Sequence, residues 1–344
     1  MSGLRVGVVG CGHLGRIHAR LLAANPSVHL VAVADPCPAA RSQVALDVRA
    51  EAHDDYRQLI GNVDAVILAA PTGLHVKIAE VLLDAGVDLL IEKPISANAH
   101  EALGVTEFAE HRNRVLAVGH VERFNPAFVA AQQRISQPRY IEATRTSGFS
   151  FRSMDVGVVL DLMIHDIELV LSLVDSPVKQ VSAEGMSVLT SHEDFGAARL
   201  EFENGTIAQL KASRVCPHAE RRISIYGETG HAFVDLGARK VEYVELSRPV
   251  LEGSLQADHL SPTEIAHYRD RVFHDWLPMT PLQVTDTNPL ADEQQDFFDS
   301  IVQGRQPRVP GSRGTLAVWI AQRIMKEIER SSPQQLPSVL RQAS

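Results

Sequence analysis

The sequence predicts an α/β protein with two domains: a doubly wound parallel sheet, then an α+β domain with a large, mostly antiparallel open sheet. Three observations predict this. A strand, a glycine loop and a helix occupy residues 6–22. Strand and helix patterns alternate to about residue 120. Short strands with turn signals then fill residues 180–246. We expect domains over residues 1–120 and 121–330, and a polar tail over 331–344.

The bulk composition is that of an ordinary globular protein. The 344 residues suffice for two cores, and 45% of them are hydrophobic and 22% charged. The net charge of −9 argues against non-specific binding to nucleic acid or to anionic membranes. Three scattered cysteines, with no signal-like or membrane-spanning stretch, lead us to expect a cytoplasmic protein without a disulfide framework or a metal site.

The first element is a phosphate-binding turn. An apolar strand over 6–9 runs into a Gly-x-Gly-x-x-Gly loop, and a helical pattern starts at Arg16. The three glycines allow a tight turn, close approach of a pyrophosphate, and close packing of helix on strand, which is the fingerprint of a dinucleotide-binding Rossmann domain. The residues expected to hold the cofactor through this loop are Gly10, Cys11, Gly12, His13, Leu14 and Gly15.

The second element indicates which dinucleotide is bound. An apolar run over 30–34 ends at Asp35, which lies 20 residues beyond Gly15. A carboxylate at this distance accepts hydrogen bonds from the adenosine ribose hydroxyls. It would repel a 2′-phosphate, so the sequence favours NAD over NADP.

The later strands of this domain, over 64–70, 87–91 and 115–119, should end at the same edge of the sheet. Ligands bind outside the carboxyl ends of parallel strands. We therefore expect the segments that follow these strands to face the cofactor crevice; the candidates are Pro71, Thr72, His75, Glu92 and Lys93, with residues 120–125 after the last strand.

In the second domain, Asn204-Gly205 and a turn over 227–230 each separate two short strands and predict hairpins. Helices are expected over 292–302 and 315–328. Residues 247–290 give no clear pattern; their three histidines, His259, His267 and His274, fit no standard ligand spacing and are expected to be solvated.

A second group of reactive side chains lies at the start of this domain. If residues 158–172 form one helix, Asp161, His165, Glu168 and Ser172 share a face. A carboxylate one turn from a histidine can orient the ring and raise its pKa, as a general base requires. The alternative is a surface helix whose polar face meets only water.

These residues carry a resemblance that covers essentially the whole chain. The glycine loop, the Glu92-Lys93-Pro94 motif and the Asp161-x-x-x-His165 pair, in this order, resemble the Gfo/Idh/MocA oxidoreductase family. Within it, residues 118–126 and 155–166 are similar to the subgroup that oxidises the C3 hydroxyl of UDP-N-acetylglucosamine. The glycine-rich run that usually precedes the Asp is reduced here to Gly157.

The resemblance implies an NAD-dependent sugar-nucleotide dehydrogenase. It implies that Lys93 acts at the sugar hydroxyl and the nicotinamide, His165 as acid/base, and Asp161 at the substrate. It also implies a homodimer or homotetramer built through the open face of the second sheet, and an aminotransferase that uses the 3-keto product for lipid A synthesis. Further candidates for the sugar and diphosphate are Arg123, Asn125, Arg145 and Arg152.

Three alternatives stay open. An inositol or other sugar dehydrogenase of the same family would share these motifs, and so would a family member that recycles a tightly held cofactor. A non-catalytic, NAD-responsive regulator would keep the glycine loop and Asp35 and lose Lys93 and His165, both of which are present.

Overall fold

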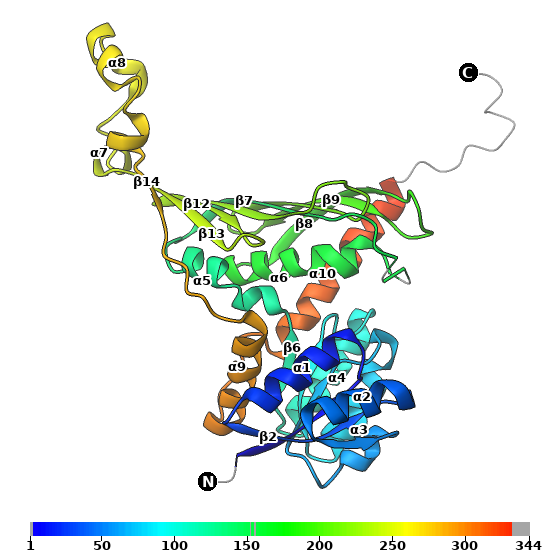
Figure 1. The fold of residues 1–344 in the computed structure, drawn as a ribbon. Helices are drawn as coiled ribbons and strands as arrows, with labels where there is room; N and C mark the ends of the chain where they lie inside the picture. The colour runs from blue at the N-terminus through cyan, green and yellow to red at the C-terminus, as the bar shows by residue number, and fades with distance from the viewer. Residues whose placement is uncertain (1–2, 152, 155, 332–344) are drawn as a thin grey trace, which may run out of the picture. The chain divides into compact units, whose positions relative to one another are not determined.

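The structure, a computed structural model, describes residues 3–331 except 152 and 155 (Figure 1). The chain divides into two compact units, residues 1–124 with 287–322 and residues 125–286 with 323–344. Residues 287–322, which include the whole of the second-last helix and the first part of the last one, thus belong to the first unit, whereas the sequence placed residues 121–330 wholly in the second domain.

The first unit is built on a six-stranded sheet in the order β3-β2-β1-β4-β5-β6, with all neighbours parallel. This order confirms the predicted doubly wound sheet; the short edge strand β3 had no recognisable pattern. The strands are β1 (Leu4–Val9), β2 (Val28–Ala34), β3 (Glu51–His53), β4 (Ala65–Leu68), β5 (Asp88–Glu92) and β6 (Leu116–Gly119).

Helices connect these strands, as the alternating pattern predicts. Within the unit, α1 packs on α2 and α3 packs on α4. The helical segments are α1 (His13–Ala24), α2 (Pro38–Val48), α3 (His75–Asp84), α4 (Ala99–His111) and α9 (Pro289–Gln303), the first part of α10 (Gly311–Ser331), and the 3₁₀ turns η1 (Tyr56–Leu59), η2 (Thr72–Leu74) and η3 (Val121–Phe124).

The return of α9 to the first unit has a packing reason. Phe297 and Phe298 are buried in the same core cluster as Val6, Val8 and Leu22 from the start of the chain. The free energy gained by burying two phenylalanine side chains exceeds the entropy cost of bringing distant segments together, because that cost grows only slowly with loop length. Amphipathic spacing predicts the helix but not the surface on which it packs.

The second unit carries an eight-stranded sheet in the order β14-β13-β12-β11-β7-β10-β9-β8. All neighbouring strands are antiparallel except β7 and β10, which are parallel. Both predicted hairpins are confirmed. The strands are β7 (Pro138–Thr146), β8 (Val178–Met186), β9 (Phe195–Phe202), β10 (Ile207–Ser213), β11 (Glu220–Gly227), β12 (Gly230–Asp235), β13 (Lys240–Glu245) and β14 (Met279–Pro281).

One face of this sheet is covered by α5 (Pro126–Gln132), the π-helix η4 (Val159–Met163) and α6 (Ile164–Leu173) (Figure 1). On the opposite face the aromatic rings of Tyr140, Tyr226 and Phe233 form a partly exposed group. This is the open face that the sequence predicts for the second domain.

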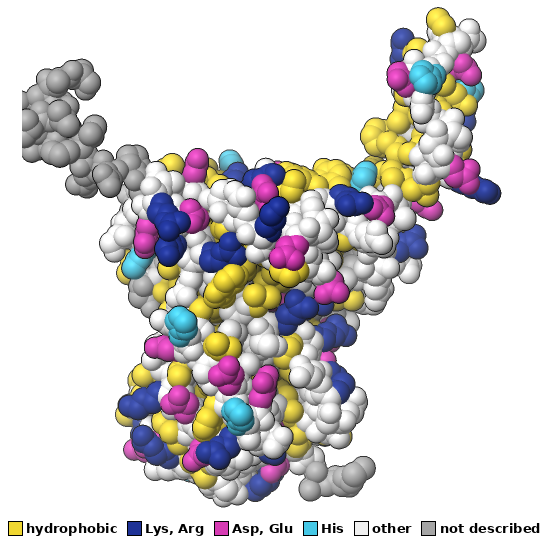
Figure 2. Space-filling model, turned by 180° about the vertical axis from the view of Figure 1, so that it is seen from behind, with side chains coloured by type: hydrophobic (Ala, Val, Ile, Leu, Met, Phe, Trp, Pro, Cys, Tyr) yellow, Lys and Arg dark blue, Asp and Glu magenta, His cyan; other side chains and the backbone are white. Residues whose placement is uncertain are grey.

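Residues 248–276 form an arm that stands away from the sheet (Figure 1). None of its helical segments contains a buried residue, and Leu251, Ile265 and Phe273 are exposed; Figure 2 shows hydrophobic side chains along the arm. The segments are α7 (Arg248–Leu251), η5 (Ala257–His259), α8 (Pro262–Tyr268) and the π-helix η6 (Val272–Trp276). Among the described residues, no helix combines the length and apolar character needed to span a membrane.

Candidate functional site

The glycine loop of the first unit forms a cradle that side chains would fill. Gly10 has φ +96°, and a Cβ there would lie 2.5 Å from the Ala69 carbonyl oxygen. A Cβ on Gly15 would lie 1.7 Å from the Gly10 carbonyl oxygen, so α1 can approach the loop only with glycine at this position. At Gly12, by contrast, nothing lies within 4 Å of a Cβ, and this open side leaves room for a ligand.

The start of α1 is suited to an anion. Gly12 is the N-cap and offers no capping side chain, and no acidic residue stands in the first turn. The first-turn amides therefore keep their positive partial charge for a ligand such as a pyrophosphate. His13 and Leu14 are exposed there, whereas Cys11 is buried. Burial and then the nearby Asp35 carboxylate raise the pKa of the Cys11 thiol to about 12, so the thiol stays neutral.

Asp35 stands directly after β2 and ties two loops together. One carboxylate oxygen accepts the Cys11 N–H at 2.7 Å, and the other accepts the Cys37 N–H at 2.8 Å. Each oxygen still has a lone pair for a further donor. The carboxylate therefore both shapes the glycine loop and offers acceptors to a ribose.

A pocket of about 490 Å³ opens beside Asp35. Its wall includes Gly10, Pro71 and the carboxylate-bearing Asp35, Asp54 and Asp55. Arg57 and Lys77 line the same pocket and offset two of these three charges. The case against a 2′-phosphate therefore rests on Asp35, whose carboxylate at the end of β2 suits the neutral ribose of NAD. The glycine cradle, the uncapped helix and this pocket together fit the cofactor that the sequence predicts.

Lys93 begins the loop after β5, where the strand-end argument predicts it. Its peptide bond to Pro94 is cis. His120, which follows β6, lies close to it: burial and then the Lys93 ammonium group lower the pKa of His120 to about 3. His120 is thus neutral at physiological pH. The sequence placed it among the residues that face the crevice and gave it no chemical role.

His75 occupies a different place from the one predicted. The ring is buried; Nδ1 lies 3.0 Å from the Pro94 carbonyl oxygen and Nε2 lies 2.8 Å from the Ala70 carbonyl oxygen. Burial lowers its pKa, and the hydrogen bonds oppose this shift. The ring therefore braces the segments after β4 and β5 instead of being directed at a ligand. Thr72 and Pro71 remain accessible at the start of η2.

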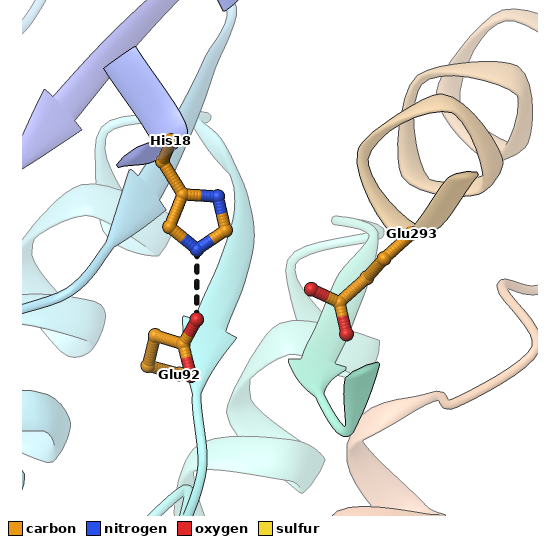
Figure 3. Close-up of side chains that lie close together, drawn as sticks. All are labelled: His18, Glu92 and Glu293. Atoms are coloured by element: carbon orange, nitrogen blue, oxygen red, sulfur yellow. Dashed lines mark hydrogen bonds and ion pairs between the residues drawn. The ribbon is translucent and has the colours of Figure 1, made fainter. Parts of the chain in front are cut away.

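Glu92, which the sequence assigned to the cofactor, has a partner within the protein. Its side chain is buried and hydrogen-bonded to His18 of α1 (Figure 3). His18 lies on the buried face of α1 with Gly15, Ala19 and Leu22. The helical period predicts this burial, and a buried imidazole requires a partner, but no local pattern identifies Glu92 as that partner.

In the second unit, Asp161 lies in a π-helix and His165 in the α-helix that continues from it. Residues 159–163 form the π-helix η4 and residues 164–173 form α6, whereas the sequence predicts one α-helix. A π turn contains more residues than an α turn, so the faces before and after it are not in register. π turns are frequent at functional sites. Asp161 and His165 are both partly exposed, as is Leu162, whereas Met163 and Ile164 are buried.

The other two residues expected on that face differ from each other. Glu168 is buried and therefore does not share the face. Ser172 is partly exposed, but its hydroxyl donates to the Leu169 carbonyl oxygen at 2.7 Å within the same helix. The helix is otherwise a core element and not a solvated surface helix.

The start of η4 is capped from the loop between β8 and β9. The Glu193 carboxylate accepts the Val159 N–H at 3.2 Å, and its carbonyl accepts the Val158 N–H at 2.9 Å. A Cβ on Gly157 would lie 1.9 Å from this carboxylate. The single remaining glycine of the reduced glycine run therefore leaves the space that the capping carboxylate fills.

A buried ion pair braces the same place. Asp194 accepts the Arg214 guanidinium at 2.7 Å, and Arg214 donates to the carbonyls of Ser153 and Val156, just before η4. Burial alone would raise the pKa of Asp194, but the N–H groups of Leu189, Thr190 and Val188 together with Arg214 hold it well below its usual range.

The predicted diphosphate residues are mostly occupied elsewhere. Arg145 is buried and forms an ion pair of 2.8 Å with Asp166 of α6, next to His165. The Asn125 side chain caps α5 and donates to the Leu236 carbonyl oxygen. Both residues thus position the second unit's helices. Arg123 lies in the last turn of η3, and Arg152 lies outside the described residues.

Comparison with known proteins agrees with this geometry. Residues 4–120 match the oxidoreductase family with an NAD-binding Rossmann fold, and residues 128–233 match the GFO/IDH/MocA C-terminal domain. The chain is 40% identical over 236 residues to the UDP-N-acetylglucosamine 3-dehydrogenase of Acidithiobacillus ferrooxidans, which covers 68% of this chain and 75% of that protein.

Other relatives act on different substrates. The NAD⁺-dependent scyllo-inositol 2-dehydrogenase of Bacillus subtilis is 29% identical over 251 residues, covering 67% of this chain and 73% of that protein. A solved structure of the Acidithiobacillus ferrooxidans enzyme superimposes with a TM-score of 0.84 at 32% identity over 96% of this chain and 99% of that chain. The chain therefore belongs to the Gfo/Idh/MocA family and is an NAD-dependent dehydrogenase.

Proposed function

We propose that the protein oxidises the C3 hydroxyl of UDP-N-acetylglucosamine to the 3-keto sugar nucleotide with NAD⁺. The observation that carries the substrate assignment is the 40% identity to a UDP-N-acetylglucosamine 3-dehydrogenase. The inositol dehydrogenases at 29% identity and below are more distant. The glycine cradle at residues 10–15 and the pocket beside Asp35 support the use of NAD⁺.

Oxidation of a secondary alcohol removes a hydride from carbon and a proton from oxygen. Bound NAD⁺ supplies the hydride acceptor. We assign the proton to His165, because it is a partly exposed imidazole on a braced helix, one residue from the buried Arg145–Asp166 pair. His120 is a poor alternative, since its pKa of about 3 makes it a weak base at neutral pH.

Lys93 stabilises the negative charge that develops on the hydroxyl oxygen as the proton leaves. An ammonium group directed at a developing alkoxide is an effective electrostatic catalyst. Asp161 helps to hold the substrate. The Glu193 cap and the Asp194–Arg214 pair keep the start of η4 in place, and therefore position Asp161.

The wider context follows from the product. A 3-keto sugar nucleotide is a substrate for a transaminase, so we propose a place before an aminotransferase in lipid A synthesis, in the cytoplasm. We also propose a homodimer or homotetramer formed through the open face of the second sheet, because partly exposed aromatic side chains on a sheet face favour burial.

A substrate panel tests the assignment. Purified protein with NAD⁺ is supplied in turn with UDP-N-acetylglucosamine, UDP-glucose, free N-acetylglucosamine, and myo- and scyllo-inositol, and absorbance of reduced nicotinamide is followed. We expect turnover with UDP-N-acetylglucosamine and much less with the free sugar. Turnover only with inositols would support the alternative dehydrogenase, and NAD binding without turnover on any substrate would support a regulator.

A further inference from the structure

A buried polar cluster in the first unit has no role in the function proposed above. His18 of α1, Glu92 at the end of β5 and Glu293 of α9 direct their side chains toward one another (Figure 3). All three are buried, and His18 is completely inaccessible. Burial of ionisable side chains is costly unless they are paired, so the hydrogen bonds between them should follow a definite pattern.

The proton on His18 can be assigned from its neighbours. The Gln294 side-chain nitrogen lies 2.8 Å from His18 Nδ1 and also donates to the His18 carbonyl oxygen at 3.3 Å. A carbonyl only accepts, so the amide must present its NH₂ group here. Nδ1 is then an acceptor, and the ring proton of the neutral imidazole is on Nε2, which donates to Glu92 Oε1 at 2.7 Å.

This proton pattern argues against the obvious alternative, a metal centre. The ligand atoms of His18, Glu92 and Glu293 all lie within 4.8 Å of one another. A metal would need the Nε2 lone pair, which moves the ring proton to Nδ1, opposite the NH₂ group of Gln294. Turning the amide would bring its oxygen against the His18 carbonyl. The cluster is therefore arranged for hydrogen bonding.

The second oxygen of Glu92 extends the chain to the neighbouring residue. Glu92 Oε2 accepts the backbone N–H of Lys93 at 3.2 Å. Gly119 leaves the space for this carboxyl group, because a Cβ at that position would lie 3.1 Å from it. On the other side of Lys93, His75 contacts the Pro94 carbonyl oxygen. The backbone around Lys93 is thus held from both sides by buried side chains.

We propose that Gln294, His18 and Glu92 form a hydrogen-bond relay that orients Lys93 for the hydroxyl oxygen. This inference rests on the catalytic role proposed for Lys93. The relay residues are positioning residues: they act on Lys93 through its backbone. Because the relay begins on α9 and passes through α1, which carries the cofactor loop, it also joins the lysine to the cofactor-binding helix.

Paired variants of His18 test the relay. His18→Leu removes the Nε2 donor, and His18→Gln restores an N–H at a similar reach. We expect His18→Leu to lower kcat about tenfold or more, with the NAD dissociation constant within about twofold of wild type, since misplacement of a catalytic group costs rate more than binding. His18→Gln should recover most of the loss. Equal kcat in all three proteins would overturn the relay.

Neighbouring glutamines supply a matched control. Gln294→Ala removes the group that fixes the histidine tautomer, whereas Gln295→Ala, one residue along α9, removes contacts to Asn25, Ser27 and Asp299. We expect kcat to fall in the first variant and not in the second. A similar fall in both would mean that α9 merely needs its polar contacts for packing.

A double-variant cycle shows whether the relay acts through Lys93. In a Lys93→Met background, His18→Leu should cause little further loss, because the group that it orients is already absent. Full additivity would contradict the relay. If Lys93→Met alone has normal turnover, the proposed catalytic role fails, and this result is distinct from a failure of the relay.

The proton assignment has its own readout, independent of activity. Nitrogen-15 NMR of the wild-type protein labelled at histidine should show a protonated Nε2 and an unprotonated Nδ1 at His18. The opposite tautomer would overturn the relay. Calorimetric titration with Zn²⁺ or Mn²⁺ should give no binding that Glu293→Gln abolishes; such binding would establish a metal centre in its place.

Discussion

At the scale of single residues, Asp35 has a structural role in addition to the ribose contact that the sequence predicts. Its carboxylate is expected to bind the ribose, and it also holds the N–H groups of Cys11 and Cys37. We predict that Asp35→Asn weakens NAD binding about tenfold or more, because an amide accepts less well and directs an NH₂ group at a donor. Calorimetry measures the dissociation constant.

The control is Asp47→Asn, which removes an exposed carboxylate that pairs with Arg20. Thermal unfolding of both variants separates loss of the ribose contact from loss of the loop. An unchanged NAD dissociation constant in Asp35→Asn would remove Asp35 from the cofactor site.

The catalytic assignment makes a second prediction at this scale. Lys93→Met and His165→Asn should each lower kcat by about two orders of magnitude or more, since each removes a group that acts on the developing charge or the proton. Lys179→Met, on exposed β8, is the control and should behave as wild type. Single-turnover rates equal to wild type in either site variant would reject that residue's role.

At the scale of elements, the β8–β9 loop determines how the π-helix η4 begins. We predict that Asp194→Asn lowers the free energy of unfolding by about 3 kcal/mol at pH 7, because Arg214 is left as a buried and unpaired charge. Urea denaturation measures this loss, with the exposed Asp175→Asn as control.

The pH dependence of this loss has a definite sign. The folded-state pKa of Asp194 is depressed, so its contribution is complete above the unfolded value of about 4 and declines as pH falls toward the folded value. The difference between wild type and Asp194→Asn should therefore narrow in acid. A difference that grows as pH falls below about 4 would contradict the assigned ion pair.

Some of these elements could be predicted from the sequence and others could not. The glycine loop, the parallel strands and both hairpins were predicted from local sequence patterns, and the structure contains all of them. The π turn at residues 159–163 does not follow from them, because a helical wheel assumes 3.6 residues per turn. The wheel assigned the buried Glu168 to the polar face. The His18–Glu92 contact joins residues 74 positions apart, and no local period reports such a pair.

At the scale of the whole molecule, self-association is the property to test. Phe233 lies on the open face of the second sheet, where its ring meets Tyr226 at a centroid distance of 5.8 Å. We predict that Phe233→Glu dissociates the proposed oligomer, because the proposed interface would bury the new charge among apolar side chains at a large desolvation cost. Sedimentation velocity measures the change.

The matched control is Val302→Glu, which places the same charge at an exposed position of α9. It should sediment as wild type. If Phe233→Glu leaves the sedimentation coefficient unchanged while the protein remains folded, the open face is not the interface. The exposed arm at residues 248–276 would then be the next surface to test.

The central claim is that the hydrogen on C3 of UDP-N-acetylglucosamine is the one removed. The most direct measurement uses UDP-N-acetylglucosamine deuterated only at C3, with NAD⁺ and mass spectrometry of the reduced cofactor. We predict that the reduced cofactor carries the deuterium and that the sugar product is the 3-ketone. Reduced cofactor without deuterium, or a ketone at another carbon, would contradict the proposed function.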